Sequence, residues 1–157
     1  MHSIWINISI WSGVAAWVIA QICKLFTFMI RERKFDYAFL FRLGGMPSSH
    51  TASSVACATS IGLRMGFGSS AFAVAFGLVA IIMVDAQTVR RAAGKQARLL
   101  NQMMDDLYRH KPFSQEKLVE FLGHTRIEVF IGLLLGVLVA LGFHYMFPAW
   151  AAMANGF

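Results

Sequence analysis

The chain has few of the residues that hold small secreted proteins together, since only two of its 157 residues are cysteine. Cys23 and Cys57 both fall inside apolar segments, so a disulfide framework is not expected, and we interpret both as reduced packing residues. Lys and Arg are absent from residues 1–20, which therefore lack the basic start of a signal peptide. These absences favour one retained domain over residues 1–157, whose first apolar segment stays in the protein.

Apolar residues make up 57% of the chain and the mean hydropathy is +0.59, as is typical of an integral membrane protein. A spanning helix needs about 20 apolar residues. The sequence predicts an all-α, polytopic transmembrane helix bundle of about four spans. These spans are expected near residues 4–30, 48–65, 69–84 and 125–146, and the third continues as a helix to about residue 104. Residues 35–41 are too few to span and form an interfacial or re-entrant segment.

The basic residues predict how the bundle is oriented, because cytoplasmic flanks are enriched in Lys and Arg. The turn between the second and third spans holds only Arg64. The other thirteen of the fourteen basic residues fall on the opposite side: Lys24, Arg31, Arg33, Lys34, Arg42, Arg90, Arg91, Lys95, Arg98, Arg109, Lys111, Lys117 and Arg126. We therefore expect both termini outside and the two long connections in the cytoplasm.

A histidine and two serines stand where the first long connection meets the second span, in the sequence Gly-Gly-Met-Pro-Ser-Ser-His from Gly44 to His50. Pro followed by Ser is a good helix opening, and the free N–H groups of a first helical turn bind phosphate. Ser48 and Ser49 are thus candidate phosphate ligands, and His50 is placed to donate a proton to a departing oxygen. The alternative is an ordinary capped helix with an interfacial histidine.

The second such junction carries His124 and, four residues later, Glu128. This spacing places both side chains on one helical face. A carboxylate that accepts from one ring nitrogen leaves the other free to attack. The same face continues through Gly132, Gly136 and Ala140, a stripe of small residues that lets helices pack closely. The alternative is an interfacial histidine, with Glu128 serving the helix dipole.

Further charges lie at the same predicted membrane surface. Lys24 and Arg31 suit phosphate binding, although positive-inside anchoring explains them equally well. Asp85 ends the third apolar stretch, where an acid must be paired or wet, so it is a functional candidate. We expect it to pair with a cation such as Lys24 or Arg31. Arg90 and Arg91 follow as candidate phosphate ligands.

Together these residues resemble the type-2 phosphatidic acid phosphatase superfamily, which includes the vanadium haloperoxidases, and in particular its divergent branch of small membrane proteins. The superfamily carries the motifs Lys-x6-Arg-Pro, Pro-Ser-Gly-His and Ser-Arg-x5-His-x3-Asp. Lys24 and Arg31 fit the first, without its proline. Pro47, Ser48 and His50 fit the second, with Ser49 for glycine. His124 and Glu128 fit the end of the third, with Glu for Asp.

The resemblance implies a role for each matching residue. His124 would attack phosphorus and form a phosphohistidine, His50 would protonate the leaving alcohol, and Glu128 would orient the nucleophile. Lys24 and Arg31 would hold the phosphate. Leu118 stands where the third motif has its arginine, so the missing charge is expected from Lys117, Arg126, Arg90 or Arg91. The resemblance implies no metal and no other cofactor.

The sequence thus predicts an integral membrane phosphatase, in a bacterial inner membrane, that hydrolyses a lipid phosphate or diphosphate at the cytoplasmic face. The substrate would be phosphatidate-like or isoprenoid. The alternative is a non-catalytic protein that binds or translocates phospholipids through a degenerate phosphate site. Nucleic acid is not an expected partner. The superfamily commonly has six spans, so a homo-oligomer is expected to complete the bundle.

Overall fold

The computed structural model describes residues 7–33, 45–107 and 124–146, and within them all regular structure is helical. The helices are α1 (Ile8–Glu32), α2 (Ser49–Met65), α3 (Ser70–Gln87), α4 (Val89–Leu107) and α5 (Arg126–Met146). The predicted all-α class is confirmed, and the helices lie close to the predicted spans. Residues 35–41, predicted to be interfacial or re-entrant, lie outside the described residues.

Polar side chains define where three of the helices begin. Asn7 caps α1 by accepting from the N–H groups of Ser9 and Ile10. Ser48 and Ser69 cap α2 and α3, each through its hydroxyl group. Such caps satisfy N–H groups that have no partner inside the helix. The helix opening predicted from Pro47 and Ser48 is therefore present, with Ser48 as the N-cap.

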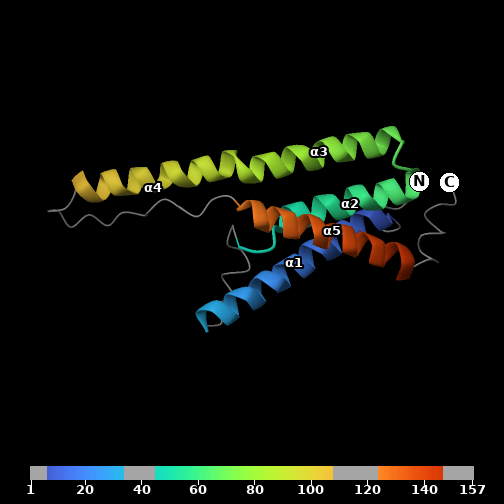
Figure 1. The fold of residues 1–157 in the computed structure, drawn as a ribbon, viewed down its shortest axis with the longest axis horizontal. Coiled ribbons are helices and arrows are strands. Elements are labelled where there is room, and N and C mark those ends of the chain that lie inside the picture. The colour runs from blue at the N-terminus through green and yellow to red at the C-terminus, as the bar shows by residue number, and fades with distance from the viewer. Residues whose placement is uncertain (1–6, 34–44, 108–123, 147–157) are drawn as a thin grey trace.

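The third predicted helix is interrupted at Thr88, which separates α3 from α4. The Thr88 hydroxyl donates to the Val84 carbonyl at 2.7 Å, and the Thr88 N–H reaches the same oxygen at 2.9 Å. Back-bonding of this kind bends helices. The two helices nevertheless run almost in one line, and α4 projects beyond the other helices (Figure 1). The prediction of a helix continuing past the third span was therefore right except for this break.

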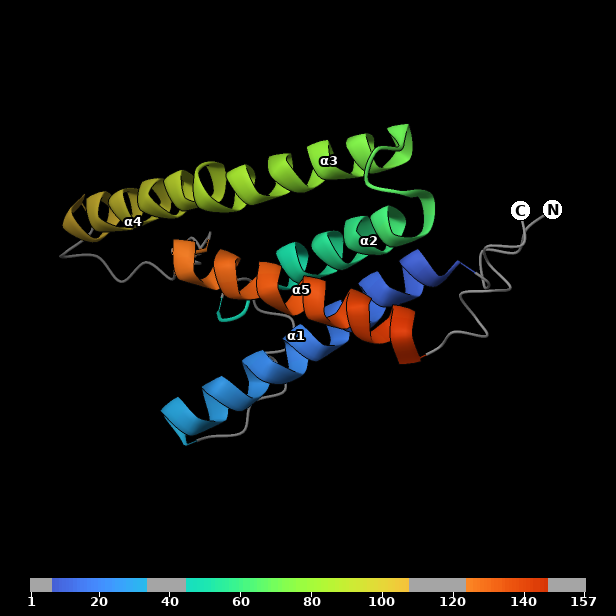
Figure 2. The same ribbon diagram turned by 45° about the vertical axis from the view of Figure 1, so that its right-hand side comes forward.

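Helix α2 lies at the centre, packed against α1, α3 and α5 (Figures 1 and 2). Within the described residues, three helical runs are long and apolar enough to cross a membrane: Ile8–Ile30, Ser70–Asp105 and Arg126–Met146. The 17 residues of α2 extend only about 26 Å, slightly less than the hydrocarbon core of a bilayer. It is the fourth member of the bundle, and its neighbours cover much of its surface.

Small residues bring α5 close to α2. Gly132, Gly136 and Ala140 are all buried, as the predicted stripe requires. A Cβ atom on Gly132 would lie 2.6 Å from the Ser48 carbonyl oxygen, and one on Gly136 would lie 2.5 Å from the Ala52 carbonyl oxygen. The two backbones therefore approach as closely as glycine permits, which is how membrane helices gain packing energy. This contact fixes the start of α5 against the start of α2.

Large apolar side chains cover the outside of the bundle. Phe26, Val74, Ile81 and Leu138 each expose about two thirds or more of their surface. A water-soluble protein rarely exposes so much contiguous apolar surface. These side chains are suited to contact with lipid, so the protein is membrane-embedded through its helices.

Candidate functional site

The site is built around His124 and Glu128, whose side chains meet as predicted. The Nδ1 atom of His124 lies 3.0 Å from Oε2 of Glu128, and His124 is 6% exposed. The same oxygen accepts from the Thr125 N–H at 3.0 Å, and the Thr125 hydroxyl accepts from the Glu128 N–H at 3.3 Å. This reciprocal pair is a capping box. Glu128 therefore caps α5 and orients the imidazole through one oxygen atom.

Backbone hydrogen bonds tie this junction to two other helices. The His124 N–H donates to the Ala86 carbonyl at 3.0 Å, near the end of α3, where helix carbonyls lack intrahelical partners. The Ser48 N–H donates to the Glu128 carbonyl at 3.0 Å, which joins the start of α2 to the first turn of α5. The histidine is thus positioned by main-chain atoms of three helices. These two bonds depend on tertiary packing, so no local sequence pattern predicts them.

A buried lysine approaches the same end of α2. Lys24 is 5% exposed, and its Nζ atom donates to the Ser49 hydroxyl at 3.1 Å. It is also close enough to Glu128 for their charges to interact. Ser49, like Ser48, is almost completely buried. Three of the predicted phosphate ligands therefore lie beside the His124–Glu128 pair, namely Lys24, Ser48 and Ser49.

Thr51 belongs to this cluster, although sequence reasoning missed it. It is fully buried, and its hydroxyl donates to the Ser48 hydroxyl at 3.0 Å. Thr51 lies three residues after Ser48 and therefore on the same helical face, which is the signal that could have found it. The Thr-x-x-Glu capping box that begins at Thr125 was equally visible in the sequence.

His50 is placed differently from the other predicted groups. It lies in the first turn of α2, and its side chain is exposed. Ser49 contacts α1 through Lys24, and Ser48 contacts α5 through its backbone N–H, whereas these contacts leave the His50 side chain exposed. The contacts described above therefore unite His124, Glu128, Lys24 and the two serines, but they do not include His50.

For most of the remaining predicted residues the structure describes the position of the backbone and not the contacts of the side chain. Asp85 is half-buried in the last turn of α3, next to Ala86, whose carbonyl holds His124. Arg31 lies near the end of α1, and Arg90 and Arg91 lie in the first turn of α4. Their backbones are thus at the same end of the bundle as His124 (Figure 1). Leu118 and Lys117 lie outside the described residues. Among the residues that the structure describes, no three His, Cys, Asp or Glu side chains form a group that could hold a metal ion.

The fold and this junction define a class, a helical membrane protein with a buried histidine–carboxylate pair beside a buried lysine. The sequence profile of the divergent PAP2 family matches residues 5–139, and the chain belongs to that family. It is 41% identical over 152 residues to the uncharacterized membrane protein YuiD of Bacillus subtilis (strain 168), a match that covers 90% of this chain and 96% of the relative. No solved structure matches. The predicted resemblance is therefore confirmed at the level of the family.

Proposed function

We propose that this protein is a metal-independent lipid phosphatase that hydrolyses a membrane lipid phosphate or diphosphate through a phosphohistidine on His124. The observation that carries the proposal is the buried His124–Glu128 pair, joined at 3.0 Å beside Lys24 and the start of α2. Family membership supports it, because in the motif resemblance the pair corresponds to the superfamily's nucleophile and orienting acid. The whole chain would act as one membrane-embedded phosphatase domain.

The reaction would proceed in two displacements. Because Glu128 engages Nδ1 of His124, Nε2 is the nitrogen that would attack phosphorus. The P–O bond to the lipid breaks as the P–N bond forms, and the leaving oxygen takes a proton from an acid, the role proposed for His50. Water then attacks the phosphohistidine and releases inorganic phosphate, returning the electron pair to Nε2. Lys24, with the hydroxyl and N–H groups near Ser49, would neutralise the phosphoryl oxygens.

The rival function is phospholipid binding or translocation without turnover. One observation favours it: His50 is exposed, and the contacts that join His124, Glu128, Lys24 and Ser49 among the described residues do not include it. A phosphate site without its acid would still bind an anionic headgroup. Translocation would then need only Lys24 and the helix N-terminus, since these bind phosphate without breaking a bond.

Purified protein in detergent micelles, offered phosphatidate, isoprenoid phosphates and their diphosphates, decides between the two functions. We expect inorganic phosphate release from at least one of these lipids, and loss of that release in His124→Ala. Lipid binding by the wild type with no release from any of them would favour the rival.

We also propose that the site faces the cytoplasm of a bacterial inner membrane, with both termini outside. The start of α1 and the end of α5 lie together at the end of the bundle away from His124, which agrees with termini on one side (Figure 2). The distribution of Lys and Arg supplies the direction. Labelling of single cysteines at Ser3 and Lys111 should occur from opposite sides of the membrane, and labelling from one side would contradict the topology.

A further inference from the structure

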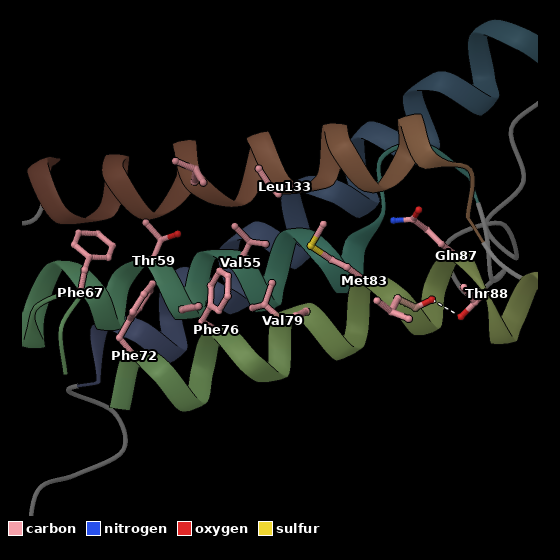
Figure 3. Close-up of a pocket in the computed structure, with 14 residues that line it drawn as sticks. Val55, Thr59, Phe67, Phe72, Phe76, Val79, Met83, Gln87, Thr88 and Leu133 are labelled. Atoms are coloured by element: carbon pink, nitrogen blue, oxygen red, sulfur yellow. Dashed lines mark hydrogen bonds between the residues drawn. The ribbon is translucent and has the colours of Figure 1, made fainter. Parts of the chain in front are cut away.

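An apolar cavity of about 630 Å³ lies between α2, α3 and α5, apart from the histidine site. One face of α3 provides half of its lining, with Phe72, Phe76, Val79, Ala80, Met83, Val84 and Gln87. The other helices add Val55, Ala58 and Thr59 from α2, and Leu133 and Val137 from α5. Figure 3 shows these side chains converging on the space from both sides. The volume is that of a pocket for one small ligand, about 300–1,000 Å³.

The two ends of the cavity differ in chemistry. At one end lie the polar side chains of Gln87 and Thr88 (Figure 3). Among the described lining residues the remaining polar side chain is Thr59, which lies toward the other end. They directly follow Ala86, whose carbonyl oxygen accepts the His124 N–H at 3.0 Å. The polar end of the cavity therefore lies next to the α3 carbonyl group that positions His124.

Aromatic rings line the other end. The rings of Phe67 and Phe72 meet edge to face with centroids 5.0 Å apart, and Phe76 follows with its ring 6.0 Å from that of Phe72. Gly62 makes room for this cluster, because a Cβ atom there would lie 2.5 Å from the Phe67 ring. From Phe72 to Gln87 the α3 backbone rises about 22 Å. One leaflet of the hydrocarbon core is only about 15 Å deep, so the cavity passes the bilayer midplane.

We infer that this cavity binds one extended hydrocarbon chain of the lipid whose headgroup lies at His124, and that Phe67, Phe72 and Phe76 set the longest chain that fits. So apolar a lining favours a hydrocarbon chain over water, and in a membrane the lipid chains would lie beside it. A chain that fills the cavity must be longer than one leaflet is deep. The position of the headgroup at His124 rests on the proposed function, whereas the binding of the hydrocarbon chain in the cavity does not.

Photo-crosslinking tests the inference without requiring catalysis. Decyl, tetradecyl and octadecyl chains, each with a terminal diazirine and with either a phosphate or a hydroxyl headgroup, are added to the purified protein, and the labelled residues are mapped by mass spectrometry. We expect the octadecyl probes to label residues 66–76 and the decyl probes to label the stretch around Val79 and Met83. Labelling spread evenly over the outward residues of α3, whatever the chain length, would overturn the inference.

Matched variants identify the cavity as the binding site. Ala80→Trp fills the cavity and should lower octadecyl labelling severalfold. Leu78→Trp, on the opposite and outward face of α3, should leave it unchanged. Equal labelling in the two variants would contradict the inference.

Phe72→Ala removes one of the rings proposed to limit chain length, so it tests that limit directly. In this variant docosyl phosphate should compete with the octadecyl probe, whereas it should compete weakly in the wild type. Equal competition in both proteins would contradict the proposal that the aromatic rings limit chain length.

The two proposals can fail separately. Cavity labelling by both headgroup series, with no phosphate release from any lipid, would remove the enzyme and keep the chain site. Phosphate release with labelling only on the outer surface would do the reverse. A second copy of the chain seated in the cavity would exclude all probes, and this result would also overturn the inference.

Discussion

The two ends of the bundle both bury polar side chains, but of different kinds. At the end where α1 begins, the Ser60 hydroxyl donates to the Ser9 hydroxyl at 3.0 Å, and Ser12 donates to carbonyl oxygens of Ser9 and Ala56. These groups are neutral and satisfy one another, as is usual for the contacts that join membrane helices. At the other end lie Lys24, His124 and Glu128, which can carry charge.

This difference indicates that the neutral side chains serve helix packing, whereas the ionisable side chains need another explanation. Neutral serines hold α1 and α2 together at one end, so the fold does not need charges to join these helices at the other. Burying an ionisable group is costly, even when it is paired. A lysine at 5% exposure beside a histidine–carboxylate pair therefore supports the proposal that this end of the bundle binds an anion.

The largest expected difference between the two ends is the loss of phosphate release when His124 is replaced. His124→Ala should lower phosphate release by at least about 10⁴-fold, because no covalent intermediate can form. Ser60→Ala, at the neutral end, should keep wild-type turnover and lose about 1 kcal/mol of stability. Turnover and thermal unfolding of both variants provide the check. Wild-type release by His124→Ala would show that the two ends do not differ in this way.

Glu128→Gln should reduce turnover by about 10³-fold, since the amide neither fixes the imidazole as well nor stabilises its charged form. Glutamine still completes a capping box, so the helix should remain stable. Thr125→Ala is the counterpart, because it removes the cap and should cost about 1 kcal/mol while leaving turnover near wild type. If the two variants lost activity in proportion to stability alone, Glu128 would be only a cap.

His50→Ala should have a smaller effect that depends on the leaving group. We expect a loss of about 10²-fold on lipid phosphates, whose alcohols need protonation, and much less on activated aryl phosphates. Rates on both substrate types, compared in the wild type and the variant, give the ratio that matters. An equal loss on both would mean that His50 is not the acid.

The last prediction concerns the packing of α5 against α2, and it is measured as stability and not as turnover. Gly132→Ala brings a Cβ atom to 2.6 Å from the Ser48 carbonyl oxygen and should destabilise the bundle by about 1–3 kcal/mol. Gly142→Ala is the matched control, because nothing lies within 4 Å of its added Cβ atom, and it should be neutral. Unfolding in detergent measures both. Equal stability would show that the close approach of α5 to α2 is not needed.

The sequence was sufficient for the parts of the structure that depend on local pattern. Apolar length and capping residues placed the helices, and the spacing of four from His124 to Glu128 predicted their contact. The break at Thr88 could not be predicted, because a threonine in a helix usually continues it. The role of His50 stays a prediction, since a motif gives the order of residues but not the contacts that each side chain makes.

The central claim is that His124 carries the phosphoryl group, and direct trapping tests it. Wild-type protein is mixed with the lipid phosphate that gives the fastest release, quenched at alkaline pH, digested and examined by mass spectrometry. We predict a phosphoryl adduct on His124 that is absent from His124→Ala and persists longer in Glu128→Gln. Sustained phosphate release without an adduct on His124, and unchanged in His124→Ala, would contradict the claim.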